Sequence, residues 1–191
     1  TLVTIFVNPT QFGPNEDLAN YPRDMEKDLS LLRQEGVDIV FAPEVDDIYP
    51  PDFSSYIDVE GLTNRLEGAH RPGHFRGVAT IVTKLFTIVR PDRSYFGQKD
   101  GQQAMVIKRL TQDLNLGTAI VVVPTVRESD GLAMSSRNIY LTATERRAAP
   151  VLYRSLMHVY QMWQSGIRSA DKLRGEVRSM VGKEPLAKLE Y

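Results

Sequence analysis

The chain has 191 residues, a formal net charge of −1 and no cysteine, with 42% hydrophobic and 25% charged residues. This length and composition suit one globular domain, or one domain with an appendage. The balanced charge gives no global field for nucleic acid. The lack of cysteine excludes disulfides and thiolate metal sites and fits a reducing compartment. No apolar run reaches the roughly 20 residues that a membrane span needs.

The first half of the chain opens with short apolar segments. Leu2–Val7 and Asp38–Ala42 are continuous apolar runs, typical of strands buried on both faces of a parallel sheet. Between them, Asp24–Glu35 is predicted to be a helix, with a glycine stop directly after it. Residues 43–55 are predicted to be a loop, and Tyr56–Val59 a short edge strand.

The middle of the chain continues the alternation. Apolar residues recur every three or four positions over Phe75–Val89, which predicts a long helix that ends before Pro91. Ser94–Gly97 is a third predicted strand, Asp100–Leu114 a second strong helix, and Ala119–Val123 a fourth buried strand.

The last third of the chain is predicted to be helical, over about Thr142–Gln164 and Ser169–Val181. Thr142 and Glu145 have the spacing of a capping box at the first of these helices. Strands that alternate with helices through short loops indicate an open parallel α/β sheet with helices on both faces. We therefore expect two domains, an α/β domain over residues 1–141 and a helical region over residues 142–191.

In an open α/β sheet, ligands bind at the carboxyl ends of the strands. Three of the loops that follow predicted strands carry polar side chains suited to binding an anion or a hydroxylated substrate. They contribute Asn8 and Gln11 after the first strand, Gly97, Lys99, Asp100 and Gln103 after the third, and Ser135, Ser136 and Arg137 after the fourth.

Each of these groups also has a purely structural interpretation. Asn8 and Gln11 could be turn residues beside a proline, and Asp100 with Gln103 has the spacing of a capping box. Lys99 alone could be a surface charge, but it lies at a predicted helix N-terminus, where free N–H groups and the helix dipole favour phosphate.

Ser135, Ser136 and Arg137 form the sharper signal. Hydroxyls and a bidentate guanidinium would complete a polyphosphate clamp opposite Lys99, although the same residues are also good turn formers. His70 and His74 have a zinc-like spacing, but an intervening Pro-Gly and the lack of a placed third ligand favour a structural or substrate-lining role.

Five segments together resemble the pantothenate synthetase (pantoate–β-alanine ligase) family: IFVNPTQF, LEGAHRPGHFRGV, RPDRSYFGQKDGQQ, VPTVRESDGLAMSSRN and YLT. The resemblance implies a Rossmann-like fold of the nucleotidyltransferase type and a cytoplasmic homodimer that uses ATP and Mg²⁺. It also implies a two-step reaction, in which pantoate and ATP form pantoyl adenylate and the amine of β-alanine then displaces AMP.

The resemblance also assigns roles to individual residues. It implies that Gln11 and Gln103 bind pantoate, with Asn8 beside them, and that Gln11 also lies near β-alanine. It further implies that Arg71 and His74 flank the pantoate pocket. It implies that the catalytic groups are Lys99, Ser135, Ser136 and Arg137. The positions that it implies for ATP are Gly97, Gln98, Lys99, Asp100, Val126, Met134, Ser135, Ser136 and Arg137, with Gln98 in place of the family's usual Glu and no metal ligand among the side chains.

Two other interpretations remain open. A different nucleotidyltransferase on the same fold would join a nucleotide to a phosphorylated acceptor, whereas the two glutamines favour an uncharged, hydroxylated one. A non-catalytic nucleotide-binding module is the other alternative. It would be favoured if the family's PTMGALHxGH segment, whose histidines contact ATP phosphates, is truly missing.

We expect residues 1–191 alone to be nearly inactive, because they contain neither that histidine segment nor most of the family's C-terminal domain. Half of the phosphate clamp would then be missing. Pantothenate formation by residues 1–191, measured beside a full-length member of the family, checks this expectation. Comparable rates for the two would contradict it.

Overall fold

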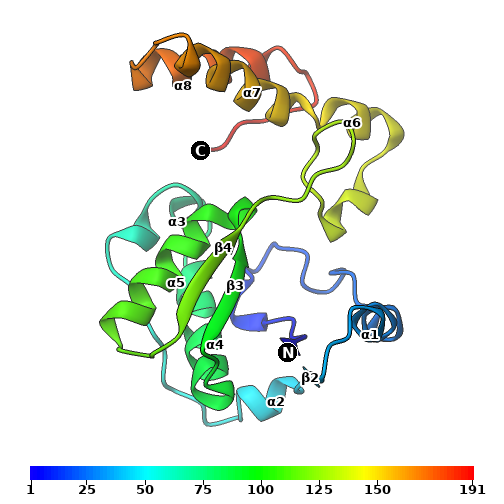
Figure 1. Ribbon diagram of the computed structural model, residues 1–191, viewed down its shortest axis with the longest axis vertical. Helices are drawn as coiled ribbons and strands as arrows, with labels where there is room; N and C mark the ends of the chain where they lie inside the picture. The colour runs from blue at the N-terminus through cyan, green and yellow to red at the C-terminus, as the bar shows by residue number, and fades with distance from the viewer. The chain divides into compact units, whose positions relative to one another are not determined.

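The computed structural model describes residues 1–191, which form two compact units, Thr1–Val123 and Pro124–Tyr191 (Figure 1). The second unit thus begins before Leu141, where the sequence suggests a domain boundary, and that boundary stays a prediction. None of the helices combines the length and the apolar character that a membrane-spanning helix requires.

The first unit contains four short parallel strands and five α-helices. The strands are β1 (Leu2–Thr4), β2 (Ile39–Phe41), β3 (Arg93–Gly97) and β4 (Ala119–Val123). The helices are α1 (Met25–Gln34), α2 (Val45–Ile48), α3 (Glu67–His70), α4 (His74–Val89) and α5 (Gly101–Asp113), with 3₁₀ turns η1 (Pro9–Gln11), η2 (Leu62–Asn64) and η3 (Gln98–Asp100).

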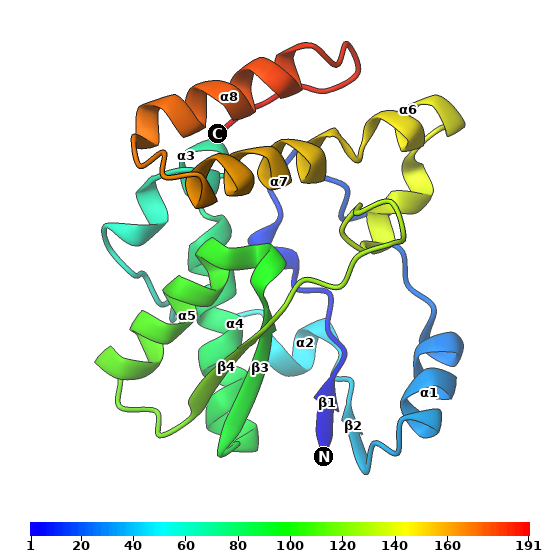
Figure 2. The same ribbon diagram turned by 45° about the horizontal axis from the view of Figure 1, so that its top comes forward.

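The predicted α/β class is confirmed, since both strand pairings are parallel and helices pack against the strands. β1 pairs with β2 in the register Val3 opposite Val40, and β3 pairs with β4 in the register Tyr95 opposite Val121. The four strands form two separate pairs and not one ladder. Figure 2 shows β1 and β3 as the facing members of the two pairs.

A cavity of about 570 Å³ lies between the two pairs, lined by Thr1–Thr4, Arg93–Phe96 and apolar residues of α4 and its end. It lies along the strands and their amino-terminal ends, and it includes none of the predicted site residues. Ligands of such sheets bind at the carboxyl ends of the strands, so this cavity lies away from the expected binding site.

The core of the first unit is formed by α4 and α5. Phe75, Val78, Ile107 and Leu110 are each no more than 2% exposed and belong to one cluster, against which Phe96 of β3 packs. The burial of each such side chain stabilises the fold by about 1.5–3 kcal/mol. This packing makes α4 a fixed support for the segments that lie on it.

Three details differ from the sequence-based expectations. The loop predicted over residues 43–55 contains the short helix α2. Residues 56–59 form no strand, because the Ile57 N–H donates to Thr80 Oγ1 of α4 and not to a neighbouring strand. The predicted helix over Thr142–Gln164 breaks in two at Pro150, which lacks the N–H that a continuous helix requires.

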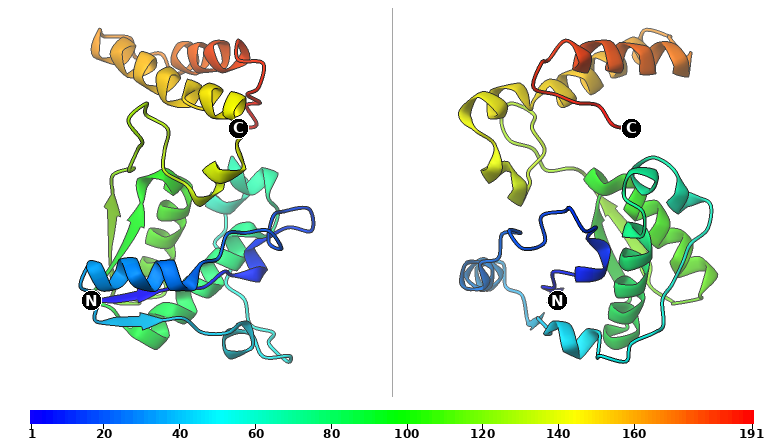
Figure 3. Two further views of the ribbon diagram at one scale, coloured as in Figure 1. Left: turned by 90° about the vertical axis from the view of Figure 1, so that its right-hand side faces the viewer. Right: turned by 180° about the vertical axis from the view of Figure 1, so that it is seen from behind.

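The second unit is helical, as expected, and its helices are α6 (Ala143–Ala148), α7 (Val151–Gln164) and α8 (Ala170–Gly182), after the 3₁₀ turn η4 (Ser136–Tyr140). The capping box at α6 is confirmed, with Glu145 N–H donating to Thr142 Oγ1 and Thr142 N–H to Glu145 Oε2. α7 and α8 pack side by side, as both views in Figure 3 show.

Candidate functional site

Asn8, which caps η1 four residues after the end of β1, is the centre of a buried hydrogen-bond cluster. It is 3% exposed, and its Nδ2 donates to the Gly77 carbonyl of α4 (3.1 Å) and to Gln11 Oε1 (3.2 Å). Its Oδ1 accepts from Thr10 Oγ1 (2.9 Å) and Tyr49 Oη (2.9 Å). Burial raises the pKa of Tyr49, which keeps this phenol a donor. Asn8 is therefore a turn residue and also the group that orients Gln11.

The turn η1 reaches this position because α4 carries glycine at its point of closest approach. A Cβ on Gly77 would lie 2.5 Å from the Thr10 carbonyl oxygen and 2.6 Å from the Gln11 nitrogen. Sequence reasoning missed Gly77. The signal was an isolated glycine inside a strong helical pattern, where glycine costs about 1 kcal/mol relative to alanine and needs a packing reason.

Arg71 and His74 lie beside the same turn. His74 is 7% exposed, and its Nδ1 lies 2.9 Å from the Gln11 carbonyl oxygen. Arg71 forms a bidentate ion pair with Glu16 (2.6 and 2.8 Å) and a further bond to Glu67 (2.7 Å). The bonds from Arg71 lower the pKa of Glu16, whereas burial lowers the pKa of His74. The structure thus brings Asn8, Gln11, Arg71 and His74 together, and the pantoate-binding role that the resemblance implies for them stays a prediction.

The second group of predicted residues lies at the carboxyl end of β3. Gly97 ends the strand, Gln98–Asp100 form η3, and α5 begins at Gly101. Lys99 and Asp100 are exposed, and Gln103 is half-buried. The capping-box interpretation of Asp100 and Gln103 is wrong, since the Asp100 side chain makes no cap hydrogen bond. The first turn of α5 and Lys99 can together bind a phosphate.

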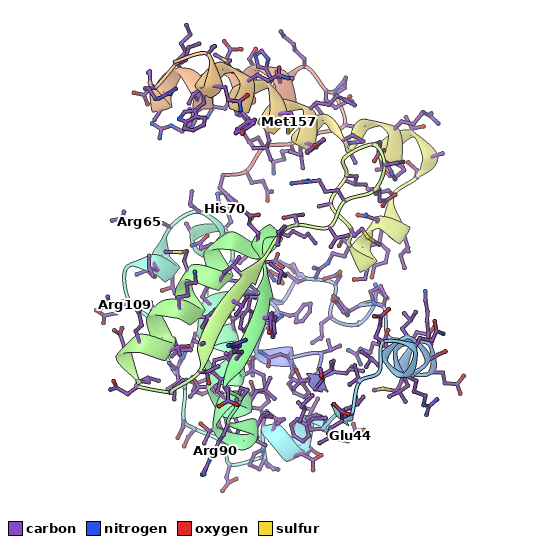
Figure 4. The ribbon with its side chains drawn as sticks, in the orientation of Figure 1. Glu44, Arg65, His70, Arg90, Arg109 and Met157 are labelled. Atoms are coloured by element: carbon purple, nitrogen blue, oxygen red, sulfur yellow. The ribbon has the colours of Figure 1, made fainter.

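Gln102, which the sequence did not single out, fixes the start of α5. Its Nε2 donates to the carbonyls of Leu62 (2.9 Å) and Arg65 (2.8 Å), and its Oε1 accepts from the Glu67 N–H (3.1 Å). In Figure 4, Arg65 lies near His70 at the end of the unit where β3 leads into α5, while Arg90 lies at the opposite end. Gln102 therefore joins α5 to the segment that carries Arg71.

The remaining predicted residues belong to the second unit. The Met134 N–H donates to the Val126 carbonyl (3.0 Å), so these two positions lie side by side. Ser135 caps η4 by accepting from the Arg137 N–H (3.2 Å), which confirms its turn role, while Ser136 and Arg137 are exposed. Asn138 Nδ2 and the Arg146 side chain both bond to Glu128 (3.1 and 2.7 Å) and hold this loop. That this loop faces Lys99 stays a prediction.

The side chains of the protein do not form a metal centre. No group of three or more His, Cys, Asp or Glu side chains is arranged to hold a metal ion. His74 in particular has both ring nitrogens engaged, by Gln11 and by Arg71. The site is instead suited to organic ligands, with amides for hydroxyl and carboxylate groups and a helix N-terminus for phosphate.

These features define an α/β ligand-binding protein in which a buried amide cluster and a basic helix N-terminus follow parallel strands. More particularly, the family model of pantoate-beta-alanine ligase matches residues 1–191, and the chain belongs to this family. The Roseiflexus sp. (strain RS-1) pantothenate synthetase is 60% identical over 190 residues, which are 100% of this chain and 68% of that protein.

Solved structures give the same result. The pantothenate synthetase of Thermus thermophilus superimposes with a TM-score of 0.93 at 50% identity, over 96% of this chain and 67% of that chain. The pantoate-beta-alanine ligase of Francisella tularensis, complexed with beta-gamma ATP and beta-alanine, has a TM-score of 0.79 at 39% identity, over 100% of this chain and 69% of that chain.

We expect the substitution Gly77→Ala to destabilise the protein, because its methyl group would overlap the main chain of Thr10 and Gln11. Overpacking of this kind costs about 1–3 kcal/mol. The free energy of unfolding from urea titration measures the effect. Gly101→Ala, where an added Cβ meets nothing within 4 Å, is the control. Equal stability of the two variants would contradict the role of Gly77.

Proposed function

We infer that the protein joins pantoate to β-alanine with ATP. A carboxylate oxygen of pantoate attacks the α-phosphorus of ATP, and the bond to pyrophosphate breaks, which gives pantoyl adenylate. The β-alanine nitrogen then attacks the acyl carbon, the bond to AMP breaks, and the nitrogen loses a proton. Adenylation is needed because a free carboxylate is a poor electrophile.

One observation carries this inference: the family match extends over every residue from 1 to 191. A relative at 39% identity that is complexed with an ATP compound and β-alanine supports ATP and β-alanine as ligands. The buried amide cluster supports a substrate that, like pantoate, presents hydroxyl and carboxylate groups, since amides both donate and accept.

For the first unit, we propose that Gln11 and Gln103 bind pantoate, with Gln11 also close to β-alanine, while Asn8, Arg71 and His74 complete that part of the site. Lys99, together with the N-terminus of α5, would stabilise the charge that develops on the phosphates. Gly97, Gln98 and Asp100 would line the nucleotide, with Gly97 and Asp100 at the ribose.

For the second unit, we propose that Met134, Ser135, Ser136 and Arg137 grip the ATP phosphates and that the main chain of Val126 meets the adenine. The hydrogen bond between Met134 and Val126 supports a shared role, because it ties the two ends of this loop together. The exposed Arg137 side chain suits bidentate binding of phosphate.

Family membership also supports Mg²⁺, a homodimer and a cytoplasmic location as proposals. The described side chains form no protein cage for an ion, and Mg²⁺ commonly binds through substrate phosphates with one or two carboxylates. We therefore propose that Mg²⁺ arrives bound to the phosphates of ATP. Sedimentation of the purified protein would test the dimer.

The reaction is tested by following pyrophosphate and AMP. Pyrophosphate release should require pantoate but not β-alanine, whereas AMP and pantothenate should form only after β-alanine is added. High enzyme concentrations allow a slow reaction to be followed. If a phosphorylated acceptor supports pyrophosphate release and pantoate does not, pantoate is excluded as the substrate.

The substitution Lys99→Ala should slow pantoate-dependent pyrophosphate release by about 10²–10³-fold, the usual loss when one preorganised donor to transition-state charge is removed. The rate in single-turnover experiments measures this. Lys108→Ala, on an exposed part of α5, is the matched control and should keep the wild-type rate. A wild-type rate in Lys99→Ala would refute the role of Lys99.

The substitution Gln103→Ala should raise the KM for pantoate by about tenfold, the effect of one buried hydrogen bond, with little change in the KM for ATP. Steady-state kinetics with each substrate varied in turn measures the two constants. Gln112→Ala, exposed near the end of α5, serves as the control. Equal effects on both KM values would count against Gln103 as a pantoate ligand.

A further inference from the structure

The cluster around His74 joins three separate segments of the first unit. Glu16 comes from the loop after η1, Glu67 from α3, and Arg71 and His74 from the junction of α3 and α4. The Glu16 and Arg71 side chains are each 25% exposed and that of Glu67 is 21% exposed, so all four groups interact in a largely dehydrated place.

The contacts of His74 determine its protonation state and tautomer. Its Nδ1 lies 2.9 Å from the Gln11 carbonyl oxygen, which can only accept, so Nδ1 carries the hydrogen. Its Nε2 lies 3.1 Å from Arg71 Nη1, which can only donate, so Nε2 presents a lone pair. Only neutral imidazole with the hydrogen on Nδ1 satisfies both contacts.

The charged groups that face His74 are Arg71, Glu67 and Glu16. Glu67 Oε1 is 3.7 Å from His74 Nε2 and favours protonation, as does Glu16, whereas Arg71 opposes it. Burial among these residues and against the Phe75 ring also opposes protonation and is the largest influence on the His74 pKa. Protonation would place a hydrogen on Nε2, directly against Arg71.

Arg71 itself has little capacity left for a substrate. Its bonds to Glu16, Glu67 and His74 occupy the Nε hydrogen, both hydrogens of Nη1 and one of Nη2. The guanidinium and the two carboxylates sum to −1 (+1 − 2), with His74 neutral. A cluster with this charge repels the carboxylate of pantoate, so Arg71 is poorly suited to bind it.

We propose that Arg71 and His74 are positioning residues, which hold the Gln11 main chain and the Glu16 loop in place for pantoate binding without contacting pantoate themselves. This inference rests on the proposed function, in which Gln11 binds pantoate. His74 fixes the Gln11 carbonyl, Arg71 fixes the tautomer of His74, and the Arg71–Glu16 pair ties the following loop to α3.

Two substitutions of His74 separate its contacts. His74→Asn keeps an amide N–H near the position of Nδ1, whereas His74→Gln extends past it and loses the donor to Gln11. Calorimetric titration should show pantoate binding about tenfold weaker in His74→Gln and within about threefold of wild type in His74→Asn. The Kd for ATP should change less than twofold in both variants.

The pH dependence of pantoate binding distinguishes a specific role of His74 from a general loss of structure. Pantoate affinity of the wild type should hold through the ordinary histidine pKa of about 6.5 and fall only at lower pH, because burial lowers the pKa of His74 and the protonated ring opposes Arg71. The sign follows from the lowered pKa: neutral His74 is retained at high pH and lost at low pH. In His74→Asn this fall should be absent over the same pH range in which the wild type loses affinity.

The control is His158→Gln, which removes a half-exposed histidine of α7 and should keep both the affinity and the pH dependence of the wild type. Thermal unfolding confirms that each variant is folded. Equal losses of pantoate affinity in His74→Asn and His74→Gln, or a pH dependence that persists in His74→Asn, would overturn this inference and leave the proposed function intact. A wild type that binds ATP but no pantoate would overturn the proposed pantoate site and this inference with it.

Discussion

The close approach of α4 to the main chain of η1 is the contact on which the amide site depends. Gly77 allows it, because any Cβ there would overlap the backbone of Thr10 and Gln11. The Gly77 carbonyl also accepts from Asn8, whose other bonds direct Gln11 and Tyr49. One helix position without a side chain therefore places a buried polar cluster against the apolar core of the unit.

The polar cluster is preorganised by groups that satisfy one another. The Asn8 side chain donates through its nitrogen and accepts through its oxygen. His74 links the Gln11 main chain to Arg71 and, through Arg71, to two carboxylates. In the dehydrated surroundings of α4 an unpaired member would be costly, so the whole set favours one geometry. Rigid placement of a binding amide is what a ligase needs when it aligns a carboxylate with a phosphate.

The turns that we propose to bind phosphate differ from the amide cluster. The turn Gln98–Asp100 is exposed, as are Ser136 and Arg137, and their suitability for an anion rests on charge and on the N-terminus of α5 more than on burial. Only their supports are fixed: Gln102 holds the start of α5, and Glu128 holds the 124–141 loop through Asn138 and Arg146. A rigid amide cluster beside exposed turns would suit the proposed division of roles, in which the amides hold the acid substrate and the turns bind ATP and release AMP and pyrophosphate.

The parallel α/β class and most of the helices and strands follow from the amino-acid sequence, because apolar periodicity is a local property. The sequence also places Asn8, Gln11 and Lys99 in the turns that follow strands and Gln103 in the first turn of the next helix. The folded structure was needed to show that the strands separate into two pairs, that the Asp100 side chain makes no cap hydrogen bond, and which contacts Gly77, Gln102 and Glu16 make. These depend on contacts between segments far apart in the chain, such as Glu16 with Arg71, which no local pattern records.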